Sequence, residues 1–218
     1  MNTEIVYLKE KLFAALDLIP THKDGSPVTN VQLDKTTAAE IEGLTIQLES
    51  CNPNPNPLVN AISLLEGSWQ LQYSTAREIR SLVSLPLGLK LGKVYQVINV
   101  TSKEFFNVAF VKHPLGLLSG YVRVTASFAP AVDDSSQLPD KRINVYFDKR
   151  YLSIEKIIGI NTPQLDPFKV VTANNPVGRV ATLDITYLDE DFRVGRGGDG
   201  SLFVLKKSDG VPNKTNSL

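Results

Sequence analysis

The spacing of hydrophobic residues changes partway along this chain, from a helical period to an alternating one. Within residues 3–19 and 34–50, apolar side chains recur every three or four positions, so we expect two amphipathic helices. Pro20 should end the first helix, and Asp34 or Thr36 should cap the second. The run CNPNPNP that follows should be an extended linker, because each proline keeps the preceding residue away from helical backbone angles.

Beyond Gly67, polar and apolar residues alternate, which is the pattern of strands with one buried face. Trp69, Leu71 and Tyr73, for example, are separated by polar residues. The pattern predicts strands at residues 68–74, 93–100, 104–111, 120–128, 141–147, 151–158, 179–188 and 201–206. About eight strands without helical crossovers indicate a mainly β fold, an antiparallel barrel or sandwich with the N-terminal helices covering one end or side.

The chain of 218 residues is expected to form a single unit, because barrels of this length commonly make one domain. Its N-terminal helical segment and proline-rich linker, residues 1–57, should pack on a barrel at residues 58–208, and residues 209–218 should be a flexible tail. Hydrophobic residues make up 42% of the chain and charged residues 21%. This balance is ordinary for a globular protein with a sizeable core, so global disorder is not expected.

Charge and residue counts narrow the classes of function. Lys and Arg together equal Asp and Glu at 23 each, so no net field draws the protein to nucleic acid or to an anionic membrane. Cys51 is the only cysteine, and the two histidines, His22 and His113, lie far apart. This leaves no thiolate metal set, histidine pair or activated nucleophile, so we expect no metal, no cofactor and no enzyme. No stretch reads as a secretory signal, transit peptide or transmembrane helix.

Two connections between the predicted strands contain more leucine than a loop needs. Residues 77–91 read REIRSLVSLPLGLKL, and residues 113–120 read HPLGLLSG. One interpretation is that these segments pack over the mouth of the barrel as a lid. The other is that they form an apolar rim that touches a membrane or admits a lipid, since contiguous exposed apolar patches usually mark binding surfaces.

The stretch YLDEDFRVGRGGDGSLFVL, residues 187–205, combines acids, arginines and glycines. A glycine loop that binds a dinucleotide would precede a helix, whereas a strand follows here. Asp189, Glu190 and Asp191 are adjacent, which is not the spacing of a calcium loop. The glycines therefore indicate a hairpin turn. Its charged residues either pair across the turn or point into a barrel and orient an apolar ligand.

Three blocks of sequence resemble the plastid lipid-associated protein or fibrillin family. They are LLEGSWQLQYST at residues 64–75, KRINVYFDKRYL at 141–152 and TYLDEDFRVGRGGDGSLFVL at 186–205, and the resemblance covers most of the chain from about Leu58 onward. It implies a lipocalin-like β-barrel whose first strand opens with Gly67-Ser68-Trp69. It also implies a place at thylakoids or lipid globules with links to photoprotection. Because no transit peptide is seen, we expect a cyanobacterial member, peripheral on the thylakoid or cytoplasmic.

The function expected from this resemblance is non-catalytic binding or sequestration of a small hydrophobic molecule, such as a quinone, a carotenoid or an acyl lipid. The alternative is a structural or interaction scaffold on lipid particles or thylakoids, with a filled barrel and no ligand. The expected partners are accordingly a lipid, a peripheral membrane surface or another protein, and no nucleic acid. The candidate ligand-binding residues are Trp69, Tyr73, Arg123, Phe128, Tyr187, Asp189, Asp191 and Arg193.

Two of these assignments stay open at this level. In the family, an acid near the C-terminus is likened to ligand-contacting acids of lipocalins, and either Asp189 or Asp191 matches that position. Arg123 shares a strand face with Tyr121 and Thr125, opposite two valines. That face is either solvated or interior, and an interior guanidinium would need a partner or an anionic ligand, since an isolated buried charge is too unfavourable.

Overall fold

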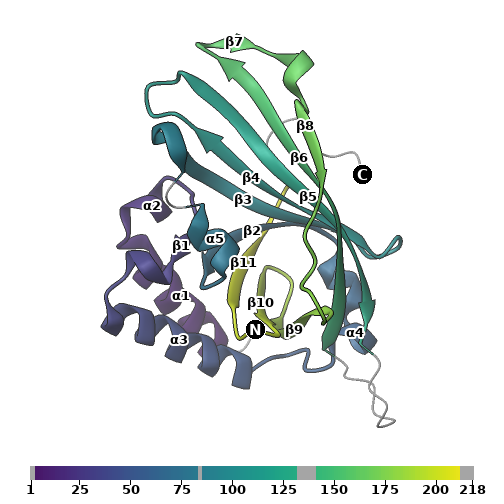
Figure 1. Ribbon diagram of the computed structural model, residues 1–218. Coiled ribbons are helices and arrows are strands. Elements are labelled where there is room, and N and C mark those ends of the chain that lie inside the picture. Colours follow the sequence, from purple (N-terminus) through teal and green to yellow (C-terminus); the bar gives the residue numbers. More distant parts are fainter. Residues whose placement is uncertain (1–2, 83–84, 132–140, 212–218) are drawn as a thin grey trace.

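Eight antiparallel strands close into a barrel in the computed structural model, which describes residues 3–82, 85–131 and 141–211 (Figure 1). The ring closes because β2 pairs with β3 on one side and with β11 on the other. In chain order the strands of the ring are β2 (Gly67–Ser74), β3 (Lys90–Asn99), β4 (Glu104–Lys112), β5 (Leu118–Pro130), β6 (Arg142–Ile157), β9 (Ala181–Leu188), β10 (Phe192–Gly197) and β11 (Leu202–Ser208). The expectation of a mainly β, lipocalin-like barrel of about eight strands is confirmed.

The eight strands differ from the predicted ones in two places. The sequence pattern predicts separate strands at residues 141–147 and 151–158, but the structure has one continuous strand, β6. The polar run Asp148-Lys149-Arg150 interrupts the alternation without interrupting the pairing, because a register shift against β5 absorbs it. Conversely, β10 occupies the glycine-rich stretch where the pattern predicts only a turn.

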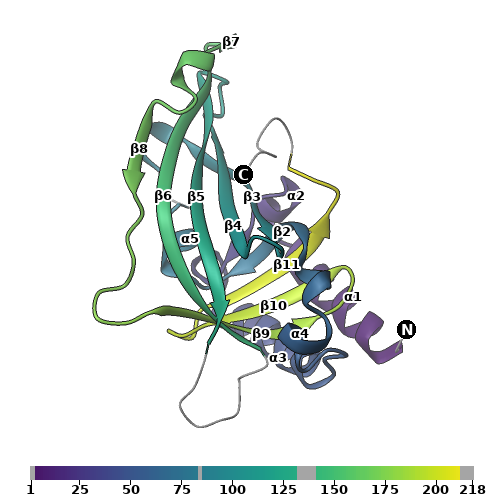
Figure 2. The same ribbon diagram turned by 90° about the vertical axis from the view of Figure 1, so that its right-hand side faces the viewer.

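Part of the sheet extends beyond the ring. Strand β6 has 16 residues, yet only residues 142–145 pair with β9. Its remaining length pairs with β5 and with two short strands, β7 (Ile160–Asn161) and β8 (Lys169–Thr172). The far halves of β3–β6, together with β7 and β8, therefore form an open extension, which we call the flared sheet (Figures 1 and 2).

Two helices, α1 (Thr3–Asp17) and α3 (Lys35–Ser50), cover the outside of β9–β11 (Figure 1). The Asp34 side chain accepts hydrogen bonds from the backbone N–H groups of Thr36 and Thr37, both at 2.9 Å, so the predicted N-cap of α3 is confirmed. Helix α1 already ends at Asp17, and Pro20 instead begins α2 (Pro20–Lys23), where its missing N–H has no helical partner to lose.

The remaining elements are short. They are β1 (Val28–Thr29), which pairs in parallel with β2, and the helical turns η1 (Asn30–Gln32), α4 (Pro57–Asn60), η2 (Ile62–Leu65), α5 (Arg77–Ser81), η3 (Pro86–Gly88) and η4 (Pro163–Leu165). Within the described ranges, no helix is both long and apolar enough to span a bilayer. Of the tail expected at residues 209–218, only 209–211 are described, and Val211 is buried against the outer face of β3–β5.

The two largest hydrophobic cores lie on opposite faces of the ring. The interior core fills the barrel and includes Trp69, Leu71, Phe105, Phe128, Ile185 and Leu205. The helix-side core lies between the ring and α1 and α3, and it includes Leu12, Leu16, Ile41, Leu48, Tyr187 and Phe192. Leu12, Leu16, Ile41 and Leu48 are 0% exposed, and each contributes about 1.5–3 kcal/mol by leaving water. Burial of this size fixes both helices on the barrel.

Candidate functional site

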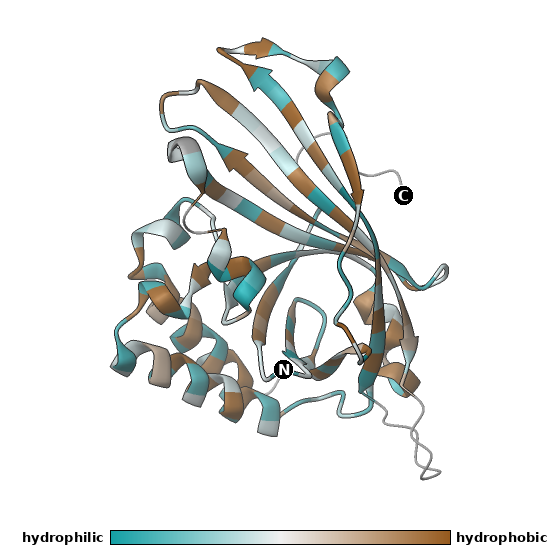
Figure 3. Cartoon of the chain, viewed as in Figure 1, coloured by the Kyte–Doolittle hydropathy of each residue, from teal (hydrophilic) through white to brown (hydrophobic). Residues whose placement is uncertain are grey.

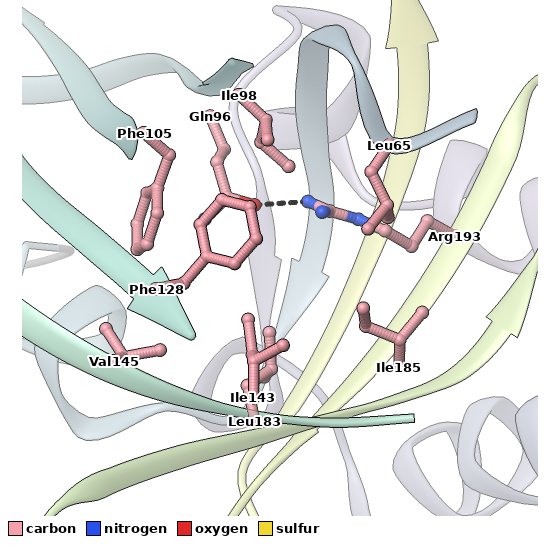
Figure 4. Close-up of a pocket in the computed structure, with 10 residues that line it drawn as sticks. All are labelled: Leu65, Gln96, Ile98, Phe105, Phe128, Ile143, Val145, Leu183, Ile185 and Arg193. Carbon is pink, nitrogen blue, oxygen red and sulfur yellow. Dashed lines mark hydrogen bonds between the residues drawn. The ribbon is translucent and has the colours of Figure 1, made fainter. Parts of the chain in front are cut away.

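A small cavity lies in the barrel interior at the level of the closed ring (Figure 4). Its volume is about 20 Å³. Roughly 10–15 Å³ is enough for one water molecule, so the cavity has room for a water but not for an acyl chain or a ring. The residues that line it come from η2 and from β3, β4, β5, β6, β9 and β10: Leu65, Gln96, Ile98, Phe105, Phe128, Ile143, Val145, Leu183, Ile185 and Arg193.

Arg193 is the charged residue of this cavity. It is 3% exposed, and its Nη2 donates a hydrogen bond to Oε1 of Gln96, across the cavity from β10 to β3 (Figure 4). Its guanidinium lies 4.9 Å from the centre of the Trp69 ring. Among the described residues, no carboxylate oxygen lies within 4.0 Å of it. Burial therefore lowers the pKa of Arg193 to about 9, because no anion offsets the loss of hydration.

Trp69 packs against the guanidinium of Arg193. Its ring is fully buried, and its Nε1–H donates to the backbone oxygen of Leu65 at 2.9 Å, which ties β2 to η2. A second cation, the ammonium of Lys207, lies 4.3 Å from the ring centre. Trp69 thus lies next to a residue that lines the cavity, Arg193, but does not line the cavity itself. Phe128 is the other aromatic candidate, and its side chain points directly into the cavity (Figure 4).

Tyr73 and Tyr187 lie on the other face of the ring, in the helix-side core. A β-bulge in each of the two strands causes this orientation. On β2, Tyr73 and Leu71 pair with the consecutive residues Val204 and Leu205, which leaves Gln72 without a partner. On β9, Tyr187 and Ile185 pair with the consecutive residues Val194 and Gly195 of β10, so Thr186 has no opposite residue in the pairing. One extra residue exchanges the two faces of a strand, so these tyrosines point toward the helices and away from the cavity.

Asp189 and Asp191 are held by helix α1. Lys9 Nζ lies 2.6 Å from Oδ2 of Asp189 and 2.6 Å from Oδ1 of Asp191, and the Tyr187 hydroxyl donates to Oδ2 of Asp189 at 2.6 Å. We call Lys9, Tyr187, Asp189 and Asp191 the Lys9 latch. Burial opposes ionisation of Asp189, but the hydrogen bonds from Lys9 and Tyr187 outweigh it and hold the pKa of this carboxyl below its ordinary value. Burial is also the main cause of the raised pKa of Tyr187.

Arg123 lies on the outer face of the flared sheet. Its guanidinium is 4.6 Å from the Tyr151 ring centre and 5.8 Å from that of Phe106, whose side chain belongs to an outer apolar cluster with Tyr121 and Val211.

The structure therefore brings together only three of the eight candidates, Trp69, Phe128 and Arg193, at the cavity. The polar lining residue that the sequence analysis did not identify is Gln96. Its position between Val94 and Ile98, two positions from each, marks it as a polar residue on an inward face.

The sequence is similar to a known protein family and to several plant proteins. The family model PAP_fibrillin matches residues 23–206. The chain is 32% identical over 203 residues to the chromoplast-specific carotenoid-associated protein of Cucumis sativus, which covers 81% of this chain and 62% of that protein. It is 30% identical over 197 residues to plastoglobulin-1 of Pisum sativum, with coverage of 78% and 54%.

A third relative is the probable plastid-lipid-associated protein 2 of Arabidopsis thaliana, 31% identical over 198 residues, with coverage of 78% and 63%. The chain thus spans between 54% and 63% of the length of these three plant proteins. All three are named as chloroplastic or chromoplastic, and their names describe association with lipid, carotenoid or plastoglobules. Because the family model matches most of the chain, the protein belongs to the plastid lipid-associated protein or fibrillin family, PAP_fibrillin.

Proposed function

We propose that this protein is a non-catalytic scaffold of lipid surfaces, on a thylakoid membrane or a lipid globule, whose barrel is filled by its own side chains. The small volume of the cavity is the main support for this proposal. About 20 Å³ is far below the several hundred Å³ of pockets that enclose small organic ligands. The relatives named for plastid lipid, carotenoid and plastoglobules support the lipid setting.

The filled interior is suited to a supporting role. Phe105 and Phe128 face each other across the interior with ring centres 6.4 Å apart, and aliphatic side chains of β6 and β9 occupy the space beside them. A close-packed core holds the strands in one arrangement, so the outer surfaces keep a fixed relation to one another. On this proposal, the protein contacts lipid and other partners through its outer surfaces.

A second candidate function is sequestration of a small hydrophobic molecule, such as a quinone, a carotenoid or an acyl lipid, in a protective role against light. The buried guanidinium of Arg193 favours it. A charge without a counter-ion is costly inside a barrel, and a ligand with a polar or anionic end would supply the missing partner. The ligand would have to displace interior side chains, above all Phe128, from their present positions.

Intrinsic fluorescence separates the two candidates without a label. Trp69 is the only tryptophan, and it contacts Arg193 beside the cavity. In a titration with decylplastoquinone or oleic acid below its micelle concentration, the scaffold predicts no saturable change in Trp69 emission. A saturable one-site change that Arg193→Gln abolishes, while the outer-face control Arg123→Gln retains it, would contradict the scaffold and establish the carrier.

A further inference from the structure

The far end of the flared sheet presents aliphatic side chains to solvent. Leu115 is 79% exposed, Ile158 72% and Ile160 71%, whereas Leu117 and Ile157 beside them are 47% and 37% exposed. We call these five residues the apolar tip. They come from the β4–β5 connection and from the turn between β6 and β7, which together form the end farthest from α3 (Figures 1 and 3). Scattered apolar residues on a surface are common, but a group of five is not.

The two turns of the apolar tip form one structure. The backbone N–H of Ile158 donates to the oxygen of Leu117 at 2.9 Å, and Leu118 pairs with Ile157 across β5 and β6. The N–H of His113 donates to the oxygen of Leu118 at 2.7 Å, which closes the other turn on the same strand. The two turns are therefore joined into one end of the sheet.

Ile158 occupies a backbone conformation that disfavours its side chain. Ile157 pairs with Ile160, so Ile158 and Gly159 are the two central residues of a hairpin turn, with φ angles of 49° and 77°. Turns of this kind ordinarily have Asn, Asp or Gly at the first central position, because a β-branched side chain is strained at positive φ. Neither folding nor solubility accounts for an exposed isoleucine at this position, whereas contact with an apolar phase does.

Three lysines lie beside the apolar tip. Lys112 ends β4 directly before one turn, Lys156 directly precedes Ile157, and Lys90 pairs with Lys112 across β3 and β4; all three are exposed. Within residues 112–119 and 154–161, Glu155 is the only acid, and burial, followed by the charge of the nearby Asp166, raises its pKa. The tip therefore combines projecting aliphatic side chains with a cationic border, which is the complement of an anionic lipid surface.

We infer that the apolar tip is the membrane-docking surface of this protein, with its leucine and isoleucine side chains in the acyl boundary and its lysines at anionic headgroups. This inference rests on the proposed function at a lipid surface. It assigns docking to the β4–β5 and β6–β7 turns. Of the other segment expected at the rim, residues 77–91, Ile79 and Leu82 pack against the interior core, while Val83 and Ser84 lie outside the described residues. Helices α1 and α3, at the opposite end, stay in the aqueous phase (Figure 1).

Vesicle flotation of the full chain tests this inference. The tip variant Leu115→Ser/Ile158→Asn/Ile160→Ser should bind vesicles of phosphatidylcholine and phosphatidylglycerol about tenfold more weakly than the unchanged protein. The matched control Leu18→Ser/Val59→Ser/Val177→Ser removes three aliphatic residues that are 66–100% exposed and lie outside the tip, and it should bind normally. Asn suits the backbone at position 158, so the melting temperature of the tip variant should not fall. Lys112→Gln/Lys156→Gln should weaken binding at low salt only.

The outcomes separate the inference from the proposed function. If the unchanged protein floats and the tip variant floats equally well, the tip inference is wrong while lipid association stands. If tip and control variants lose binding equally, docking is not local to the tip and the inference also fails. If the unchanged protein does not float with any vesicle, both proposals fail. If the tip instead joins two copies of the chain, light scattering should show a dimer for the unchanged protein and for the control variant, but a monomer for the tip variant. Flotation would then be the same for all three proteins, and the tip inference would be wrong.

Discussion

Lys9 Nζ in the first helix lies 2.6 Å from Oδ2 of Asp189 in the β9–β10 turn, so a residue near the start of the chain is bound to one near its end. Both side chains are largely buried, with 15% and 19% exposure. The same Oδ2 accepts the hydroxyl of Tyr187, whose ring packs in the helix-side core. The acids of the β9–β10 turn thus join helix α1 to the barrel.

The two acids of the latch should differ in their effect on stability. Asp189→Ala removes the partner of a buried hydroxyl and of a largely buried ammonium, and it should lower the free energy of unfolding by about 2–3 kcal/mol. Asp191→Ala removes a carboxylate whose side chain is 63% exposed, and it should change stability by less than about 1 kcal/mol. Urea unfolding followed by circular dichroism measures both. Equal effects, or a larger loss in Asp191→Ala, would assign the main role to the exposed ion pair.

The contribution of the Lys9 latch to stability should also be lost in acid. Because the pKa of Asp189 is lower in the folded than in the unfolded protein, the unfolded chain binds more protons between the two values, and stability rises with pH there. The contribution of Asp189 is therefore complete above its unfolded pKa of about 3.9 and is lost as pH falls through the folded pKa. The difference in unfolding free energy between the unchanged protein and Asp189→Asn should be constant from pH 7 to pH 5 and shrink below about pH 4. A difference that does not shrink as the pH falls below 4 would contradict this assignment.

Helix caps and strand positions could be predicted from neighbouring residues in the sequence, whereas strand faces and long-range contacts could not. Asp34 caps α3 because a cap depends on residues two and three positions away, and the strand that opens at Trp69 is likewise local. The faces of Tyr73 and Tyr187 depend on the bulges at Gln72 and Thr186, which only the partner strands reveal. Lys9 meets Asp189 across 180 positions of the chain, and no periodicity predicts a contact of that separation.

The buried charge of Arg193 should be a net cost to stability. Burial lowers its pKa to about 9, so folding disfavours the charged form, and the amide oxygen of Gln96 that accepts its hydrogen bond supplies no counter-charge. Arg193→Met fills similar space without charge and should raise the free energy of unfolding by about 1–4 kcal/mol, or the melting temperature by several degrees. Differential scanning calorimetry at pH 7 measures the change, with Arg123→Met on the outer face as the matched control. A fall in melting temperature would mean that the guanidinium stabilises the barrel through Trp69 and Gln96.

Phe128 tests whether the barrel is packed in solution. Its ring is 5% exposed and lines the small cavity, so Phe128→Ala should leave a void and lower the free energy of unfolding by about 3–5 kcal/mol. Phe168→Ala removes the same ring from a position that is 48% exposed, and it should cost less than about 1 kcal/mol. Chemical unfolding of both variants gives the comparison. If Phe128→Ala costs no more than Phe168→Ala, the interior already contains room beside the ring. The barrel would then be open enough to admit a ligand, and the carrier would replace the scaffold as the better account of its function.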